Sequence, residues 1–158
     1  MNPARVPLIL ILAASAVVVG AALLSQYWGG LAPCELCLYE RWPYYLAIGI
    51  ALLALAFPRP GLGRAALLLL VLVFLASAAL GFYHLGVERH WFAGPSSCTS
   101  TGRVPQTLEE LKALLARTQV VMCDQPQWTL WGISLAGWNF VASMLIAAFG
   151  LWTWKHNA

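Results

Sequence analysis

The sequence predicts an all-α membrane protein in which four spanning helices form a single bundle. Hydrophobic residues make up 61% of the 158 residues and charged residues only 9%, whereas a water-facing domain normally needs about a quarter charged residues. The apolar residues are gathered into four stretches, and about 20 apolar residues are needed for one α-helix to cross a hydrocarbon core. We therefore expect one integral membrane domain, residues 1–158, embedded in a lipid bilayer and without a nucleic-acid partner.

Three of the four apolar stretches are long enough to cross a bilayer, and one is short. The last stretch contains one strongly polar residue, Asn139, which we expect to hydrogen-bond between helices. The second stretch, residues 44–57, reaches spanning length only if its helix begins before Pro43, which is tolerated because a first helical turn leaves that N–H unpaired anyway. The predicted spans are residues 6–24, 40–57, 65–85 and 133–154, with outer loops at about residues 25–43 and 86–132.

The distribution of lysine and arginine predicts which side of the membrane each segment faces. Residues 1–5, 58–64 and 155–158 hold four cations and no acids in 16 residues, whereas the two outer loops hold five cations and all six acids in 66 residues. Short cation-rich segments stay in the cytoplasm. Both termini are therefore expected in the cytoplasm, and all four cysteines on the opposite side, where disulfides persist.

The long outer loop is expected to contain a short helix from Thr107 to about Arg117. The first four residues, Thr-Leu-Glu-Glu, have the pattern of a capping box, and the leucines of this segment fall on one face of a helix. Because the nearest apolar partner for that face is the bilayer, we expect the helix to lie flat at the outer interface. Cys98 and Cys123 would then lie before and after it, on mobile arms.

The cysteines carry the candidate chemistry. Cys34 and Cys37 form a CxxC motif at the start of the second span, and Cys98 and Cys123 lie in the long loop. Four cysteines on one face can form structural disulfides, a zinc site or a redox relay. Structural disulfides are disfavoured because a spanning bundle needs no cross-links and a CxxC bridge closes a very small loop. Zinc is possible, but the sequence does not indicate a zinc site, because Cys98 and Cys123 are 25 positions apart. We favour redox chemistry and predict no metal centre.

The motifs together resemble the bacterial disulfide bond formation protein B (DsbB) family. The resemblance rests on Cys-x-x-Cys-x-Tyr-Glu-Arg at residues 34–41, on Tyr83-His84 at the end of the third span, and on one cysteine on each side of the short loop helix. It implies a thiol:quinone oxidoreductase of the bacterial inner membrane, which reoxidises a periplasmic thioredoxin-like disulfide donor of the DsbA type. The alternative is a non-enzymatic four-span scaffold whose cysteines form structural disulfides in the outer loops.

The resemblance also implies a role for each cysteine. The partner's thiolate would attack Cys98 and form a mixed disulfide there, and Cys123 would be the bonded mate of Cys98. Cys34 and Cys37 would then receive the electrons. Cys37 would be the cysteine that faces the membrane quinone, either ubiquinone or menaquinone.

The residues around Cys37 are consistent with this division. Cys37 lies near a helix N-terminus, and Arg41 projects from the same face if the helix starts early, so both the helix dipole and the guanidinium would favour a Cys37 thiolate. Arg41 could also donate a hydrogen bond to a quinone carbonyl; alternatively it is an interfacial anchor or a partner for Glu40. His84 either contacts headgroups or delivers protons and contacts the quinone. The predicted quinone site therefore consists of Cys37, Arg41 and His84.

Overall fold

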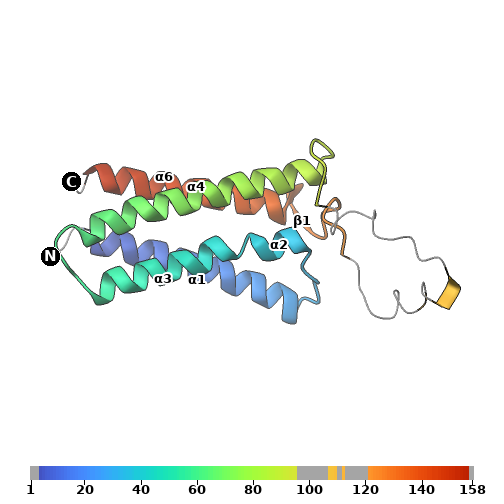
Figure 1. Cartoon of the computed structure of the whole chain (residues 1–158), viewed down its shortest axis with the longest axis horizontal. Coiled ribbons are helices and arrows are strands. Elements are labelled where there is room, and N and C mark those ends of the chain that lie inside the picture. Colours follow the sequence, from blue (N-terminus) through green and yellow to red (C-terminus); the bar gives the residue numbers. More distant parts are fainter. Residues whose placement is uncertain (1–3, 96–106, 110–111, 113–120, 157–158) are drawn as a thin grey trace.

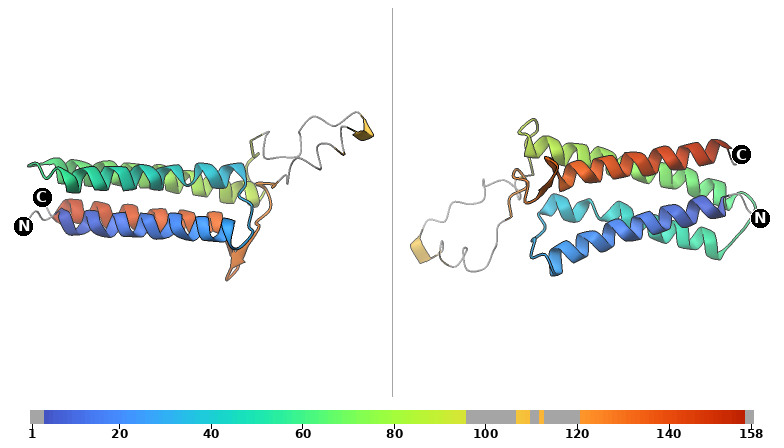
Figure 2. Two further views of the ribbon diagram at one scale, coloured as in Figure 1. Left: turned by 90° about the horizontal axis from the view of Figure 1, so that it is seen from below. Right: turned by 180° about the vertical axis from the view of Figure 1, so that it is seen from behind.

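The longer helices of the molecule run side by side along one axis (Figures 1 and 2). The computed structural model describes residues 4–95, 107–109, 112 and 121–156. Its elements are α1 (Arg5–Tyr27), α2 (Glu35–Tyr39), α3 (Trp42–Ala56), α4 (Leu62–Glu88), β1 (Thr129–Leu130), β2 (Ile133–Ser134) and α6 (Leu135–His156). Helix α1 packs against α3, α3 packs against α4, and α4 packs most extensively against α6.

Helices α1, α4 and α6 are long and apolar enough to cross a membrane, which agrees with the first, third and fourth predicted spans. The second predicted span, residues 40–57, has a different structure. Helix α3 contains 15 residues, a length of about 22 Å, whereas a hydrocarbon core is about 30 Å thick. The five-residue helix α2 precedes it, with Glu40 and Arg41 at the junction. A bundle of four spans, in which α2 and α3 together complete the second crossing, stays a prediction.

Local sequence explains where the helices begin and end. Helix α2 begins after Cys34, whose backbone is extended and whose sulfur accepts a hydrogen bond from a backbone N–H of the first turn. Helix α3 ends before Phe57 because the following residue, Pro58, disfavours a helical conformation in its predecessor. Gly61, at a φ of +81°, takes a left-handed conformation that other residues adopt only with strain. The chain can therefore reverse tightly between α3 and α4.

The predicted fourth span begins two residues too early, because a short hairpin precedes α6. Strands β1 and β2 pair antiparallel, and the two residues between them, Trp131 and Gly132, have positive φ angles of 52° and 77°. These angles are those of the two-residue turns that fit the twist of a β-hairpin. Helix α6 then starts after Ser134, whose Oγ accepts a hydrogen bond of 3.1 Å from the Gly137 N–H. Hydrophobicity alone could not reveal this boundary, because Ile133 in the strand is as apolar as the residues of a spanning helix.

Small residues allow α4 and α6 to approach closely. A Cβ added at Gly81 would lie 3.0 Å from the backbone nitrogen of Phe140, and one added at Gly150 would lie 3.0 Å from Val71 Cγ2. Small residues at such contacts are typical of helix packing in membranes, where helices gain little from hiding apolar surface and depend on close van der Waals contact. Large apolar side chains on the outer faces of α1, α3, α4 and α6 are instead exposed, including Ile9, Val17, Leu53, Leu69, Leu72 and Leu145.

A polar cluster joins three helices inside the bundle. The hydroxyl of Tyr44 on α3 donates to Asn139 Oδ1 on α6 at 2.7 Å and lies 3.0 Å from the hydroxyl of Ser143. The Ser143 hydroxyl in turn lies 2.9 Å from that of Ser77 on α4. The expectation that Asn139 hydrogen-bonds between helices is therefore confirmed.

Helix α2 and the β-hairpin lie at one end of the molecule, which we call the cysteine end, while α1 begins and α6 ends at the other (Figure 1). This arrangement agrees with the prediction that both termini lie on one side of the membrane and the CxxC motif on the other. Which side is the cytoplasm stays a prediction. The predicted interfacial helix, residues 107–117, and the flanking segment with Cys98 fall largely outside the described residues and also stay predictions. The expectation that Cys123 lies on a mobile arm is wrong, because Cys123 is fully buried in a hydrophobic cluster.

The predicted orientation can be tested with cysteine reporters in a chain whose four native cysteines are replaced by serine. Trp28 is 87% exposed near the cysteine end, and Arg59 is exposed at the opposite end, between α3 and α4. A membrane-impermeant maleimide should label Trp28→Cys in intact spheroplasts and should label Arg59→Cys only after permeabilisation. The reverse pattern would show that the cysteine end faces the cytoplasm.

Candidate functional site

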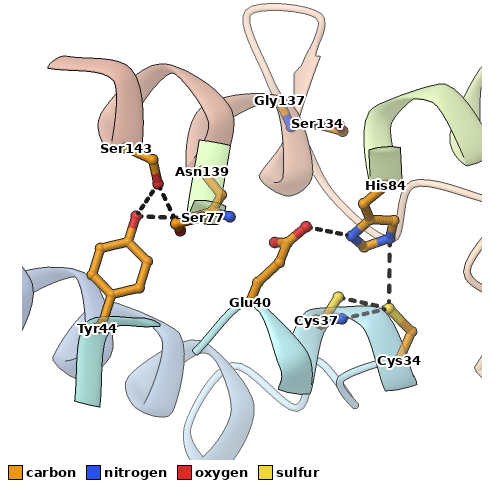
Figure 3. A network of polar contacts seen from close by, with 10 residues as sticks. All are labelled: Cys34, Cys37, Glu40, Tyr44, Ser77, His84, Ser134, Gly137, Asn139 and Ser143. Carbon is orange, nitrogen blue, oxygen red and sulfur yellow. Dashed lines mark hydrogen bonds and ion pairs between the residues drawn. The ribbon is translucent and has the colours of Figure 1, made fainter. Parts of the chain in front are cut away.

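The two cysteines of the CxxC motif lie in contact at the start of α2 (Figure 3). Their sulfur atoms are 2.8 Å apart, and the Cys37 N–H donates a hydrogen bond of 3.2 Å to Cys34 Sγ. Both cysteines are free thiols in the structure. Cys34 occupies the N-cap position, with an extended backbone that turns its side chain back over the first turn of α2. This position gives its sulfur one of the backbone donors that a helix N-terminus leaves unpaired.

His84 approaches the pair from α4, 50 residues further along the chain. Its Nε2 lies 3.7 Å from Cys34 Sγ, and the side chain is buried, with 2% of the residue exposed. The sequence left two places open for His84, at the lipid headgroups or at the site. The structure places it beside the CxxC motif.

Glu40 completes this chain of contacts, although it was not among the residues predicted for the site. Its Oε1 lies 2.8 Å from His84 Nδ1, and only 7% of Glu40 is exposed. Because a carboxylate can only accept, His84 donates through Nδ1–H, which leaves Nε2 to exchange a proton with the Cys34 sulfur. One signal could have indicated the contact: two ionisable residues at the ends of neighbouring spans, at similar depth, must find partners.

The contacts around the cysteines favour a thiolate on Cys34. Its pKa is lowered to about 5, first because the side chain of Cys37 hydrogen-bonds to the sulfur and then because His84 does, although burial acts in the opposite direction. The pKa of Cys37 is raised because its thiol is held in the hydrogen bond to Cys34 and because most of the side chain is withdrawn from water. The expectation that the helix N-terminus and Arg41 would favour a thiolate on Cys37 is therefore wrong for this structure.

Arg41 does not belong to the same helix as Cys37, because α2 ends at Tyr39 and Arg41 is the N-cap residue of α3. The guanidinium donates a hydrogen bond of 2.6 Å from one Nη to Gln26 Oε1 on α1. The suggested pairing with Glu40 is also wrong, since Glu40 pairs with His84. Arg41 therefore joins the α2–α3 junction to α1.

Cys123, near the end of the long outer loop, lies in the same buried cluster as the CxxC motif. It is disulfide-bonded and fully buried. Cys98 lies outside the described residues. The buried cluster that contains Cys123 also contains Cys34, Leu36 and Val87, with Cys37, Tyr83 and Val121 packed against it. Two cysteine segments far apart in the sequence thus share one cluster at the cysteine end.

Comparisons with known proteins identify the family of the chain. The family model for disulfide bond formation protein DsbB matches residues 4–153. The chain belongs to the DsbB family. A disulfide bond formation protein B of Methylococcus capsulatus is 34% identical over 146 residues, covering 88% of this chain and 87% of that protein. Disulfide bond formation protein B 1 of Pseudomonas aeruginosa is 30% identical over 159 residues, covering 95% and 93%. No solved structure matches the chain.

Membership of the DsbB family, together with the apolar helices, makes the chain a disulfide-forming membrane protein. Similarity also extends to an uncharacterized protein of Rickettsia prowazekii, which is 30% identical over 137 residues, covering 85% of this chain and 78% of that one. Of the predicted site residues in the described part of the DsbB-family chain, Cys34, Cys37 and His84 lie together. Cys123 packs in the same cluster, and Arg41 contacts Gln26.

The pKa of Cys34 can be tested by alkylation of the reduced protein in a Cys98→Ser, Cys123→Ser background. A thiolate is present only above its pKa, so modification by a small reagent should stay fast as the pH falls from 8 to roughly 6 and should slow around pH 5. His84→Ala removes one of the contacts that lower this pKa and should move the midpoint upward. His90→Ala, at an exposed histidine, is the matched control. An unchanged midpoint in His84→Ala would show that the histidine does not act on the thiol.

Proposed function

We propose that this chain is a thiol:quinone oxidoreductase that oxidises the dithiol of a periplasmic thioredoxin-like protein and passes the electrons to membrane quinone. One observation carries the proposal. At one end of a bundle of apolar helices, a CxxC pair contacts a histidine, and that histidine contacts a buried carboxylate. Family membership supports disulfide formation as the outcome. In this proposal the protein lies in the inner membrane, with its cysteine end in the periplasm.

The first exchange takes place on a disulfide between Cys98 and Cys123. The partner's thiolate attacks Cys98 Sγ, which forms a mixed disulfide and releases Cys123 as a thiolate. The partner's second thiol then attacks the partner's own sulfur in the mixed disulfide and releases Cys98. The partner leaves with a disulfide, and the chain holds the two electrons and two protons as the Cys98 and Cys123 thiols. The disulfide-bonded state of Cys123 supports this assignment.

The second exchange passes these electrons to a disulfide between Cys34 and Cys37. We assign the attack to Cys123 on Cys34, because both are buried in one cluster, at 0% and 3% exposure. This attack releases Cys37 as a thiolate. Cys98 then attacks Cys123, which restores the first disulfide and releases Cys34 as a thiolate. The backbone N–H of Cys37 and the ring of His84 are placed to stabilise that leaving thiolate.

His84 handles the proton of Cys34 in this scheme. With Nδ1–H donated to Glu40, the free Nε2 can take the thiol proton before Cys34 is oxidised and return it after Cys34 is reduced. Glu40 is a positioning residue, because it holds the ring in the tautomer and orientation that this exchange requires. The alternative, a scaffold with structural disulfides, does not explain a free CxxC pair in contact with a histidine.

The terminal acceptor supported by this arrangement is a quinone, which supplies a two-electron, two-proton acceptor that diffuses within the bilayer. Arg41 is suited to bind such a ligand. Its guanidinium already donates a hydrogen bond to the amide oxygen of Gln26, and a quinone carbonyl is a neutral acceptor of the same kind. Cys37 is partly exposed and lies at the edge of the buried cluster, so it is the sulfur that would face the ring. His84 remains the third predicted contact.

The assignment of the first exchange predicts a trapped intermediate. Cys123→Ser removes the bonded mate of Cys98 and leaves Cys98 as a free thiol. A partner variant with one cysteine, supplied as an activated disulfide, should therefore form a mixed disulfide with Cys98 that accumulates. Electrophoresis without reductant should show the adduct, and reductant should dissolve it. Cys98→Ser is the matched control and should give none. An adduct on Cys34 or Cys37 would reverse the assignment of the two pairs.

The proposed contact of Arg41 with the quinone predicts a kinetic defect. Arg41→Ala removes one charge-assisted hydrogen bond, a loss that typically costs about 1.5–3 kcal/mol. Quinone reduction at limiting quinone should therefore fall roughly ten- to a hundredfold. Lysine at position 41 should restore only part of the rate, since it keeps the charge but loses the planar guanidinium.

The measurement is steady-state quinone reduction across a quinone titration, with membrane insertion checked in parallel. Arg89→Ala is the matched control, because Arg89 is exposed and lies just after the end of α4. It should leave the rate unchanged. If Arg41→Ala also leaves the apparent quinone affinity and the maximal rate unchanged, Arg41 only anchors the junction to α1.

A further inference from the structure

Three metal-ligating atoms converge at the CxxC motif. The sulfur atoms of Cys34 and Cys37 and one ring nitrogen of His84 all lie within 4.8 Å of one another. Disulfide exchange needs the two sulfurs in contact, but it does not need a nitrogen ligand within reach of both. The convergence therefore raises the question of what the reduced site binds when no electron acceptor is available.

One of the three distances between these atoms already matches a tetrahedral thiolate–imidazole site, and a second is about 1 Å too short. Around Zn²⁺, with bonds of about 2.3 Å to sulfur and about 2.05 Å to nitrogen, ligand atoms lie about 3.6 Å apart for a sulfur–nitrogen pair and about 3.8 Å apart for two sulfurs. Cys34 Sγ and His84 Nε2 are already 3.7 Å apart. The two sulfurs, at 2.8 Å, must separate by about 1 Å, which a rotation of the partly exposed Cys37 side chain can provide.

The surroundings of His84 are also those of a metal ligand. Metal-binding histidines usually donate a hydrogen bond from the N–H of their second ring nitrogen to a carboxylate, which fixes the ring and makes the other nitrogen a better ligand. Glu40 accepts from His84 Nδ1 at 2.8 Å and leaves Nε2 directed at the sulfur of Cys34 (Figure 3). Two thiolates would also neutralise a divalent cation, so that a buried site would carry little net charge of its own.

We propose that the reduced form of this protein binds a thiophilic divalent cation, such as Zn²⁺, through Cys34, Cys37 and His84, and that the bound cation blocks oxidation of the dithiol. Binding exchanges the two thiol protons for the metal and transfers no electrons. The disulfide form has no thiolates and does not bind. A fourth position is left for water. The inhibition rests on the proposed function, whereas the binding does not.

Metal binding can be measured on the full-length protein in detergent without quinone or partner. In a Cys98→Ser, Cys123→Ser background, the reduced protein should bind one equivalent of Co²⁺, seen as thiolate-to-cobalt charge-transfer absorption, and Zn²⁺ should displace it. After oxidation of Cys34 and Cys37 to the disulfide, the absorption should be absent. No absorption in the reduced protein, or equal absorption in both states, would overturn the proposal.

Variants identify the ligands. His84→Ala should weaken the affinity at least tenfold, Glu40→Gln should weaken it roughly ten- to a hundredfold through the loss of ring orientation, and His156→Ala, at an exposed histidine, should have no effect. His84→Cys guards against a folding defect, since it supplies a third thiolate and should restore binding with stronger charge-transfer absorption. Equal affinity in His84→Ala and the parent would overturn the site, because the dithiol alone would then be the ligand.

The inhibition is tested separately with the native chain, a reduced dithiol partner and quinone. Micromolar Zn²⁺ should suppress quinone reduction and a chelator should restore it, and His84→Cys should make the inhibition stronger in whatever activity that variant retains. Unchanged turnover at a Zn²⁺ concentration that saturates the reduced site would overturn the blocking role. Absence of turnover without any metal would instead contradict the proposed function, and the spectroscopic result would still decide the metal site.

Discussion

The contact between Glu40 and His84 determines the geometry of the cysteine end. Glu40 is 7% exposed and His84 2%, so neither side chain can rely on water, and removing one partner of such a buried pair typically costs about 3–5 kcal/mol. The contact joins the α2–α3 junction to α4 across 44 residues of sequence. It thereby holds Cys34, at the N-terminus of α2, 3.7 Å from the other nitrogen of the same ring.

The junction between α2 and α3 follows from two neighbouring side chains with partners on different helices. Glu40 is directed to His84 on α4, and Arg41 donates to Gln26 on α1. At the junction with these two contacts, the segment does not form one long helix. It forms the two shorter helices α2 and α3. As a result, the CxxC motif lies on a short helix at the end of the bundle, where its sulfurs can meet the segment that carries Cys123.

Sequence reasoning succeeded where the determinants are local and failed where they depend on packing. The three long apolar helices and the contact within the CxxC motif follow from composition and from a spacing of three residues, which a helical turn brings together. The expected thiolate on Cys37 was wrong because it assumed one continuous helix from Cys37 to Arg41. Glu40 was missed because its partner, His84, is brought near only when α4 packs beside α3, and no local pattern specifies that pairing.

In the two proposals, the same three ligand atoms serve two chemistries that exclude each other. Disulfide exchange needs Cys34 to lose its proton readily and to be reached by another sulfur. His84 and the N-terminus of α2 favour the loss of the proton, because both contact the Cys34 sulfur. Those features also make a dithiol attractive to a thiophilic cation, because a sulfur stabilised as a thiolate is a better metal ligand. A site of this kind therefore remains metal-free only if its reduced state is short-lived. In the proposed function, rapid removal of electrons from Cys34 and Cys37 would then protect the site as well as complete the turnover, and a shortage of acceptor would expose it to metal.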